Sequence, residues 1–274
     1  MTAGSEVADG RRIGRLYGLV IMLLVVIGGG GSTVYAYRHW WLPPVASVQG
    51  QTTDRLFYST LYVTGAVFIF VHVLLALILW RYGAHGDERA AYFHEHKSLE
   101  LSYTIIPAVV MAVMVSMSGV VWSKLHSPPP VDALVAEVRG EQFVWKTRYP
   151  GPDGVFGKID PKQMNQTNPM GLDRNDPAAA DDIVANDLHV VVDRPVRLRI
   201  WSRDVLHAFF VPAFRMKQDA VPGMNNEIWF TPTNSADLEI ACAELCGIGH
   251  YIMRGKVKVE SQAEFDAWLA QQKK

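Results

Sequence analysis

Three long stretches without a charged side chain constrain this chain more than any other feature of its sequence. They run from Leu16 to Tyr37, from Leu56 to Trp80 and from Leu101 to Ser123. Each exceeds the roughly 20 residues that a helix needs to cross the hydrocarbon core of a bilayer. A single such run could be a buried helix of a soluble protein, but three in succession favour membrane-spanning helices.

The first run has a second interpretation. A basic segment with Arg11, Arg12 and Arg15 precedes it, and a basic start followed by an apolar run is also typical of a signal peptide. However, the run is long for the apolar core of a signal peptide, and no small-x-small cleavage site follows before Arg38. We therefore interpret it as a retained membrane helix, with an uncleaved or cleaved signal as the alternative.

The basic residues around these runs predict the orientation of the chain. Six lie before the first run or between the second and third, and two lie between the first and second. The six are Arg11, Arg12, Arg15, Arg81, Arg89 and Lys97, and the two are Arg38 and Arg55. Short loops rich in Lys and Arg stay in the cytoplasm. The sequence therefore predicts a multi-pass protein of the bacterial inner membrane, with everything after Trp122 on the periplasmic side.

Beyond the third run the patterns shorten to strand length. Seven segments lie between turn residues, and several alternate apolar and polar side chains as half-buried antiparallel strands do. They are 134–138, 142–148, 187–192, 196–201, 227–231, 238–241 and 255–259. An extended linker, Ser127-Pro-Pro-Pro130, precedes them, and 150–185 is expected as a long surface loop. A helix over 261–272, with Ser261 as N-cap and Glu264 at its third position, closes the chain.

These patterns predict a membrane-anchored all-β protein. We expect an anchor and outer loop in residues 1–55, a transmembrane helical hairpin in 56–126 and an antiparallel β-sandwich or barrel in 127–274. The first 126 residues hold nine Lys and Arg against seven Asp and Glu, which leaves 17 against 20 for the rest, a balance of −3. This mildly acidic domain suits a basic protein partner and argues against nucleic acid.

Both cysteines of the chain lie in one short stretch, Cys242-Ala-Glu-Leu-Cys-Gly-Ile-Gly-His-Tyr-Ile-Met253. Thiolate, imidazole and thioether are soft or borderline donors, and together they suit copper. A second imidazole, His207, lies upstream in an apolar segment with strand character. We expect the two segments to meet and to hold copper.

The number of donors favours two metal ions. A mononuclear blue-copper site uses two histidines, one cysteine and a weak axial methionine, and this chain has one cysteine more. Two bridging thiolates would give each copper two sulfurs and one imidazole, from His207 or His250, with Met253 and one oxygen as weak axial donors. Such a closed site is suited to electron transfer. A zinc site of Cys242, Cys246, His250 and His207 and a local disulfide are the alternatives.

The cysteine stretch, read as Cys-Ala-Glu-Leu-Cys-Gly-x-x-His-x-x-Met, closely resembles the dinuclear CuA motif of cytochrome c oxidase subunit II. Other segments resemble the same family in the same order. They are Glu100-Leu-Ser-Tyr-Thr-Ile-Ile-Pro107, Gly140-Glu-Gln-Phe-Val-Trp-Lys-Thr-Arg-Tyr-Pro150, Asp204-Val-Leu-His207 and Lys217-Gln-Asp-Ala-Val-Pro-Gly223. The resemblance extends over most of the chain, from Leu56 to Val259.

The resemblance implies a cupredoxin-like domain on a two-helix hairpin, docked on a haem–copper catalytic subunit I and on subunit III. It implies that a CuA centre accepts electrons from cytochrome c and passes them to haem in the catalytic subunit, an oxidoreductase and translocase that reduces O2 to water and pumps protons. The implied copper ligands are His207, Cys242, Cys246, His250, Met253 and the backbone carbonyl of Glu244.

Four acidic residues receive further roles from the resemblance. The Glu244 carboxylate would help to bind Mg2+ at the interface with the catalytic subunit. Asp204 and Asp219 fall where acids of the family dock cytochrome c or position the copper site. Glu100 falls at the cytoplasmic mouth of a proton pathway. A carboxylate near the start of a membrane helix is costly unless it reaches water or a partner, so an acid that only extends to the interface is the alternative.

The sequence departs from the family pattern at three places. Phe143 replaces the tryptophan at which electrons are proposed to enter, so we interpret Trp145 as a core residue. Met224 replaces a common arginine, and the helix at 16–37 lies outside the two-helix pattern. A quinol oxidase subunit II shares the fold but lacks the copper ligands. A subunit of a CuA-type nitric oxide reductase and a membrane-anchored copper-delivery protein are the alternative functions.

Overall fold

The structure is a computed structural model that describes residues 3–83 and 91–272, with side chains from residue 12 onward. Arg89 and the side chain of Arg11, two of the basic groups that predict the orientation, lie outside these residues. Internal contacts divide the chain into two compact units. A helical unit comprises Met1–Trp41 and Arg55–Val120, and a β-rich unit comprises Leu42–Asp54 and Val121–Lys274.

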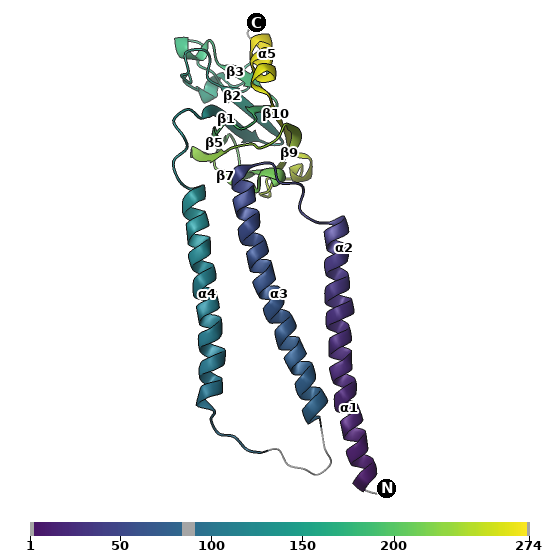
Figure 1. Cartoon of the computed structure of the whole chain (residues 1–274). Helices are drawn as coiled ribbons and strands as arrows, with labels where there is room; N and C mark the ends of the chain where they lie inside the picture. Colours follow the sequence, from purple (N-terminus) through teal and green to yellow (C-terminus); the bar gives the residue numbers. More distant parts are fainter. Residues whose placement is uncertain (1–2, 84–90, 273–274) are drawn as a thin grey trace. The chain divides into compact units, whose positions relative to one another are not determined.

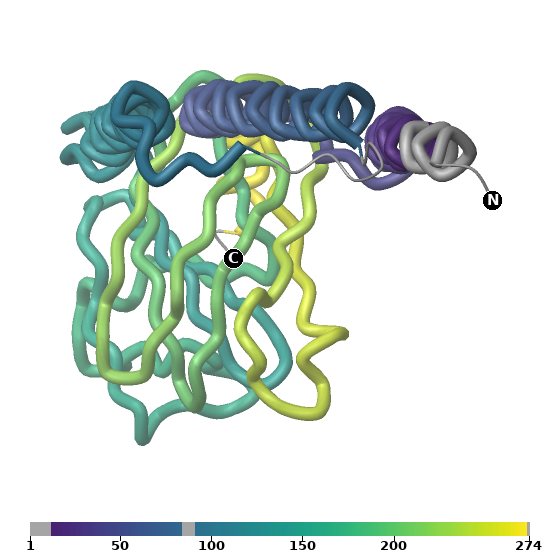
Figure 2. The backbone as a smooth tube through the Cα atoms, turned by 90° about the horizontal axis from the view of Figure 1, so that it is seen from below, coloured from purple at the N-terminus to yellow at the C-terminus, as the bar shows by residue number. Residues whose placement is uncertain are grey.

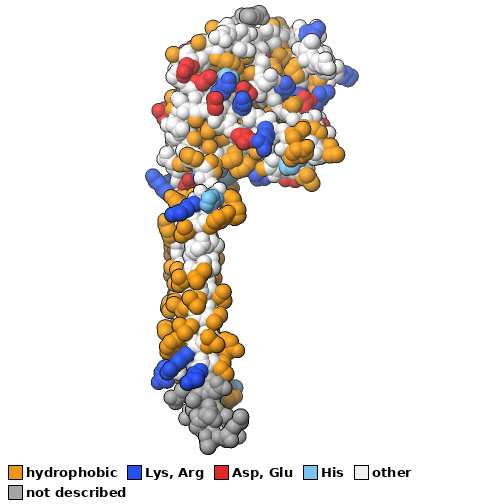
Figure 3. Space-filling view, turned by 90° about the vertical axis from the view of Figure 1, so that its right-hand side faces the viewer, with side chains coloured by type: hydrophobic (Ala, Val, Ile, Leu, Met, Phe, Trp, Pro, Cys, Tyr) orange, Lys and Arg blue, Asp and Glu red, His pale blue; other side chains and the backbone are white. Residues whose placement is uncertain are grey.

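The helical unit is built from the three predicted apolar runs. The first lies in α1 (Ala3–Leu23), a π-helical segment (Leu24–Gly30) and α2 (Gly31–His39), the second in α3 (Val48–Tyr82) and the third in α4 (Lys97–Leu125). All three regions are long and apolar enough to cross a membrane. Figure 1 shows α3 and α4 running in opposite directions, and Figure 3 shows apolar side chains covering the helical part between groups of basic side chains.

Small residues bring α1 close to the end of α3. A Cβ on Gly14 would lie 2.7 Å from the Cα of Gly83, and one on Gly18 would lie 2.9 Å from the carbonyl oxygen of Ala76. Small residues at such contacts allow the close backbone approach that stabilises helix pairs in membranes. Figure 2 shows α1 beside this end of α3.

The β-rich unit is a sandwich of two five-stranded sheets. The first has the order β3-β2-β1-β5-β8, and the second has the order β4-β10-β9-β6-β7. The strands of the first sheet are β1 (Leu134–Glu141), β2 (Val144–Tyr149), β3 (Ile183–Ala185), β5 (Val196–Ser202) and β8 (Asn226–Phe230). Those of the second are β4 (Leu188–Val191), β6 (His207–Val211), β7 (Met216–Ala220), β9 (Ala236–Cys242) and β10 (Arg254–Glu260).

The predicted fold class is confirmed, with one refinement in strand direction. The pairs β1–β5 and β10–β4 are parallel, and the other pairs are antiparallel. Alternating apolar and polar side chains indicate that one face of a strand is buried, but they do not indicate the direction of the strand that pairs with it. In β5, for example, Val196, Leu198 and Ile200 are fully buried between the sheets while Arg197 and Arg199 point outward. The sequence therefore predicted the strand and which of its faces is buried, but it did not predict which strands pair with it.

Besides the seven predicted segments, β6 lies in the upstream segment of His207 that has strand character, and two further strands were not predicted. β7 reads Met-Lys-Gln-Asp-Ala and lies at the edge of its sheet, and β3 has only three residues. Mostly polar or very short segments carry no clear period of two. Both strands form because the backbone of a neighbouring strand provides hydrogen-bond partners, and this depends on the tertiary structure.

The segment 150–185 is irregular, as predicted, but it is not confined to the surface. Met170 is fully buried, and two buried arginines of the first sheet bond to the segment. Arg148 of β2 donates to the Asp182 carboxylate and to the carbonyl of Gly157, and Arg139 of β1 donates to the carbonyl of Pro169. The segment therefore covers part of the sheet and is held there by charged groups.

The segment Leu42–Asp54 belongs to the β-rich unit although it precedes the second membrane run. The N–H of Ala46 donates to the carbonyl of Ala213 (2.8 Å), and the N–H of Val48 donates to that of Thr231 (3.0 Å). Ser47 is fully buried and its hydroxyl donates to the carbonyl of Phe214 (3.0 Å). The first turns of α3 are thus built into the sandwich.

The predicted C-terminal helix is confirmed as α5 (Gln262–Gln272). The Ser261 N–H and hydroxyl donate to the Glu264 carboxylate at 2.9 and 2.7 Å, and the Glu264 N–H donates back to the hydroxyl at 3.3 Å. This is the reciprocal capping arrangement that the sequence predicted. Phe265 and Trp268 then pack against the ring of Tyr149, with centroids 6.1 and 5.2 Å away.

Candidate metal centre

Strand pairing brings the two predicted ligand segments together. His207 begins β6 and Cys242 ends β9, and these strands pair with Phe209 opposite Cys242. The loop after Cys242 returns into β10, where Arg254 pairs with Ala241. The N–H of Cys242 donates to the carbonyl of Met253 (3.2 Å), so the two ends of the loop lie side by side.

The two cysteine sulfurs lie between two imidazoles, that of His250 in the loop and that of His207 in β6. The Sγ atoms of Cys242 and Cys246 are 3.8 Å apart. Nδ1 of His207 is 3.9 Å from the Cys242 sulfur, and Nδ1 of His250 is 3.6 Å from the Cys246 sulfur. The donor atoms of His207, Cys242 and Cys246 all lie within 4.8 Å of one another and form a possible metal site.

Two weaker donors lie beside the sulfurs. The Met253 Sδ atom is 3.7 Å from the Cys246 sulfur, and the carbonyl oxygen of Glu244 is 3.2 Å from the Cys242 sulfur. Both cysteines are free thiols, and their separation is far greater than the roughly 2.05 Å of a disulfide bond. Thiolates, imidazoles and a thioether in this arrangement fit a soft metal such as copper.

Three of the donor residues are shielded from water, while Cys242 and His250 are partly exposed. His207 is fully buried, and Met253 and Cys246 expose 1% and 4% of their surface. Burial, with the nearby Cys242 thiol, raises the pKa of the Cys246 thiol to about 11. A metal ion must displace this proton, because the thiolate is the ligand.

Asp204 fixes the orientation of the His207 ring. Its carboxylate accepts a hydrogen bond from Nε2 of His207 (2.8 Å), which leaves Nδ1 unprotonated toward the Cys242 sulfur. Partial burial alone would raise the pKa of Asp204, but hydrogen bonds from the Gln142 N–H, His207 and the Val205 N–H outweigh it and hold the pKa below its ordinary value. Carboxylate partners of this kind set the tautomer and basicity of a ligating histidine.

Gln142 and Phe143 support the ligand loop from the neighbouring sheet. The Gln142 side-chain amide donates to the carbonyl of Cys246 (2.6 Å). The Phe143 ring lies against the loop so closely that a Cβ on Gly249 would be 2.5 Å from it. Gly247 has a φ of +134°, which favours glycine. This role of Gln142 was not predicted, because no spacing pattern in the sequence links it to Cys246.

The other predicted residues have more ordinary surroundings. Trp145 is 3% exposed and packs edge-on against His207, with ring centroids 6.0 Å apart, as expected of a core residue. Asp219 pairs with Lys217 on the surface (2.9 Å). Met224 is exposed in the turn after β7. Glu100 lies in the helical unit, where its carboxylate accepts a hydrogen bond from the His96 N–H at the start of α4 (3.1 Å).

A sequence model described as cytochrome C oxidase subunit II, periplasmic domain, matches residues 134–260, and one described as the transmembrane domain matches residues 36–119. The "Alternative cytochrome c oxidase subunit 2" of Bradyrhizobium diazoefficiens is 39% identical over 241 residues, which cover 87% of this chain and 86% of that protein. The chain belongs to the cytochrome c oxidase subunit II family.

Other members of the family show the same likeness. The "Cytochrome c oxidase subunit 2" of Cereibacter sphaeroides is 31% identical over 224 residues, 77% of this chain and 73% of that one. The crystal structure of the periplasmic domain of subunit II of Bradyrhizobium japonicum is 31% identical, with a TM-score of 0.40, over 53% of this chain and 96% of that one.

The subunit II family predicted from the cysteine stretch is therefore confirmed. The region that matches its periplasmic domain includes all six residues predicted as copper ligands. Spanning-type helices followed by this domain fit a membrane-anchored subunit.

Proposed function

We propose that this chain is the electron-accepting subunit of a respiratory cytochrome c oxidase and holds a dinuclear CuA centre. The observation that carries the proposal is the pair of sulfurs 3.8 Å apart with an imidazole Nδ1 beside each. Cys242, Cys246, His207, His250, Met253 and the backbone carbonyl of Glu244 would hold the two copper ions. A copper pair bound there supplies one-electron chemistry.

The surrounding residues are suited to electron transfer rather than to substrate binding. Asp204 and Gln142 hold His207 and the Cys246 backbone in place through hydrogen bonds. Such fixed ligands need little rearrangement when the charge of the metal changes. The loop also exposes four large apolar side chains, Leu245, Ile248, Tyr251 and Ile252, which offer a dry contact surface to a protein partner.

With this function we associate the partners and location predicted from the sequence. Its curated relatives are named as subunits of cytochrome c oxidase. We therefore propose cytochrome c as donor, a haem–copper subunit I with subunit III as partners, and O2 reduction and proton pumping in the assembled enzyme. The chain would cross the bacterial inner membrane several times, with residues 1–55 as anchor and outer loop, 56–126 as hairpin and 127–274 in the periplasm.

The acidic residues keep their predicted roles within this proposal. The Glu244 carboxylate would help to bind Mg2+ at the interface with subunit I, and Glu100 would stand at the mouth of a proton pathway. Asp219, half-exposed beside Lys217, would contribute to docking of cytochrome c. Asp204 is better supported as a positioning residue, because it bonds to His207.

The alternative functions are not favoured. The two relatives described above are named for cytochrome c oxidase rather than for nitric oxide reduction. A copper-delivery protein must release its metal, and a donor set in which His207, Cys246 and Met253 are buried is poorly suited to release.

Electron paramagnetic resonance of the copper-loaded full chain in detergent tests the proposal. One electron shared by two copper nuclei should give a seven-line hyperfine pattern and a purple colour. Cys246→Ser should abolish that pattern, whereas Asp219→Asn, on the neighbouring strand β7, should preserve it. A four-line mononuclear signal, or a colourless protein that retains zinc, would contradict the proposal.

A further inference from the structure

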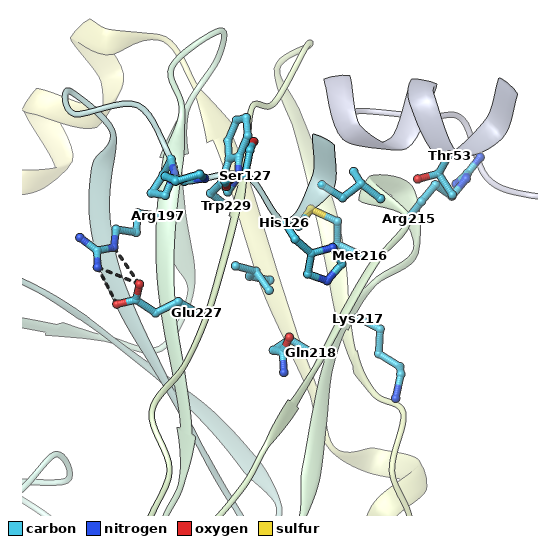
Figure 4. A pocket seen from close by; sticks show the side chains of 14 residues that line it. Thr53, His126, Ser127, Arg197, Arg215, Met216, Lys217, Gln218, Glu227 and Trp229 are labelled. Atoms are coloured by element: carbon cyan, nitrogen blue, oxygen red, sulfur yellow. Dashed lines mark hydrogen bonds and ion pairs between the residues drawn. The ribbon is translucent and has the colours of Figure 1, made fainter. Parts of the chain in front are cut away.

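A two-residue turn of the first sheet lies against the loop that joins β9 to β10 and carries most of the predicted ligands. β1 ends at Glu141 and β2 begins at Val144, and these two residues pair, so Gln142 and Phe143 form the turn between them. The cavity in Figure 4, of about 350 Å³, lies elsewhere, between the edge strands β7 and β8, and its lining includes neither the turn nor a donor residue. Turn and ligand loop are in direct contact, since the Gln142 side-chain amide donates to the carbonyl of Cys246 (2.6 Å).

The β1–β2 hairpin also supports the His207 side of the site. The backbone N–H of Gln142 donates to one carboxylate oxygen of Asp204 (2.8 Å), and the other oxygen accepts from Nε2 of His207 (2.8 Å). Gly140, two residues before the turn, lies against the same imidazole, because a Cβ there would be 3.0 Å from Cδ2 of His207. The position of this ring therefore depends on the hairpin of the first sheet as well as on its own strand.

Phe143 supports the His250 side. A short 3-10 helix begins at His250, whose N–H donates to the carbonyl of Gly247 (3.1 Å). The N–H of Ile252 donates in the same way to the carbonyl of Gly249 (3.1 Å). The Phe143 ring lies against both glycines: a Cβ on Gly249 would be 2.5 Å from Cδ2 of the ring, and one on Gly247 would be 3.3 Å from Cε1. The ring therefore packs directly under the backbone that presents the second imidazole.

Ion pairs fix the base of the turn. The Glu141 carboxylate pairs with Arg139 at 2.6 Å and with Arg203 at 2.7 Å, and Arg139 is fully buried. The N–H of Arg203 also donates to the carbonyl of Gly140 (3.0 Å). Contacts between charged groups of this kind are stronger than hydrogen bonds between neutral groups. The turn is therefore a fixed support for the ligand loop.

We propose that Phe143 is a positioning residue of the metal centre, and that the β1–β2 turn sets the spacing between the segments that carry His207 and His250. This inference rests on the proposed CuA function. In the family pattern the same position is a tryptophan at which electrons are proposed to enter. Here the ring is partly buried, packs against the core and contacts the two glycines before His250. It would keep the donors near their bound positions before copper arrives, so that binding orders little of the loop.

Copper affinity and electron paramagnetic resonance of the full chain in detergent test the proposal. Phe143→Ala should weaken copper binding about tenfold, as losses of supporting contacts to metal ligands do. It should also make the two copper ions inequivalent, so that the seven-line pattern loses its even spacing. Phe156→Ala is the matched control, because Phe156 is another partly buried ring of the β-rich unit but lies over Arg148 and Arg199. It should leave both measurements unchanged.

A double variant separates positioning by the ring from a general loss of stability. Gly249 has a φ of −93°, which alanine adopts freely, so Gly249→Ala is obstructed only by the Phe143 ring. This single substitution should weaken copper binding by about tenfold or more. In Phe143→Ala/Gly249→Ala the added methyl has room, so the copper affinity and the even line spacing should recover toward wild type. Two unrelated losses of stability would add instead.

Three results would overturn the proposal. The first is a Phe143→Ala chain with the affinity and the line pattern of wild type, and the second is a double variant that binds copper no better than Gly249→Ala. The third is an assembled oxidase in which Phe143→Ala slows electron uptake from cytochrome c while affinity and line pattern stay unchanged, because position 143 would then serve electron entry. A wild-type chain without the seven-line pattern would overturn the proposed CuA function, and this inference with it.

Discussion

The His207 ring is held between Asp204 on one nitrogen and the Cys242 sulfur on the other. The sequence predicted both residues, but the spacing of three between Asp204 and His207 did not show that they bond. A strand would point them to opposite faces. They meet because the turn before β6 ends at His207, and the carboxylate also accepts from the Gln142 N–H (2.8 Å) on the adjoining sheet.

Replacing Asp204 tests this positioning role. Asp204→Ala should weaken copper binding by the full chain about 10- to 100-fold, as losses of hydrogen-bond partners to ligating histidines do. Competition with a copper chelator measures the affinity. Asp219→Ala is the control, since Asp219 bonds to Lys217 at the surface and should leave the affinity unchanged. Equal effects of the two substitutions would show that Asp204 does not position the ligand.

At the scale of elements, buried arginines attach the 150–185 segment to the first sheet. The side chains of Arg148 and Asp182 are 1% and 0% exposed, and the guanidinium also lies 4.9 Å from the Phe156 ring centre. A composition rich in Gly, Pro, Asp and Asn predicted an irregular segment correctly. The composition did not predict that the segment is attached to Arg148, because the partner of a buried charge depends on which strand the segment covers.

Arg148→Ala should therefore destabilise the β-rich unit strongly. Removing one partner of a buried ion pair typically costs about 3–5 kcal/mol. Chemical denaturation of the detergent-solubilised chain gives the free energy of unfolding. The exposed pair of Arg254 and Glu239 provides the control, where Arg254→Ala should cost less than about 1 kcal/mol. A similar cost for both arginines would mean that Asp182 finds another partner or water.

The N-terminal cap of α5 makes the stability of the chain depend on pH. Hydrogen bonds from the Ser261 hydroxyl and N–H hold the pKa of Glu264 below its ordinary value. In the unfolded chain the pKa of this carboxyl is about 4.3. The cap therefore stabilises the folded chain fully above that pH. This stabilisation is lost as the pH falls through the pKa that Glu264 has in the folded chain.

Glu264→Gln keeps the capping geometry but removes this titration. The difference in melting temperature between wild type and variant should be largest near neutral pH and should shrink below pH 4. Thermal unfolding followed across that range measures it. Asp266→Asn, one turn away in α5, is the matched control for loss of a surface carboxylate. A difference that stays constant with pH would show that Glu264 does not act as the titrating cap.

At the scale of the whole molecule, α3 belongs to both units. Val48, its first residue, and Ser47 just before it bond to the sandwich, and the rest of the helix contains the second apolar run. The sequence predicted the run but assigned residues before Leu56 to an outer loop. Hydrogen bonds between segments more than 150 residues apart leave no pattern in the sequence.

The predicted orientation is testable by labelling in cells. A cysteine at Lys256→Cys, in the sandwich, should react with a membrane-impermeant maleimide while the inner membrane is intact. One at His94→Cys, before α4, should react only after permeabilisation. The parent chain, which keeps both native thiols, gives the background. The reverse pattern would contradict an outward-facing domain and a cytoplasmic loop between α3 and α4.

The sequence by itself determined the spanning runs, most of the strands, the capped C-terminal helix and the set of soft metal donors. These follow from local properties: uncharged length, periodicity, capping residues and the chemistry of side chains close in the chain. Only the tertiary structure decided which strands pair in parallel, how 42–54 and 150–185 attach to the sandwich, and how Asp204 and Gln142 support the ligands. Those contacts depend on strand order, because residues distant in the sequence become neighbours only after the sheets have formed.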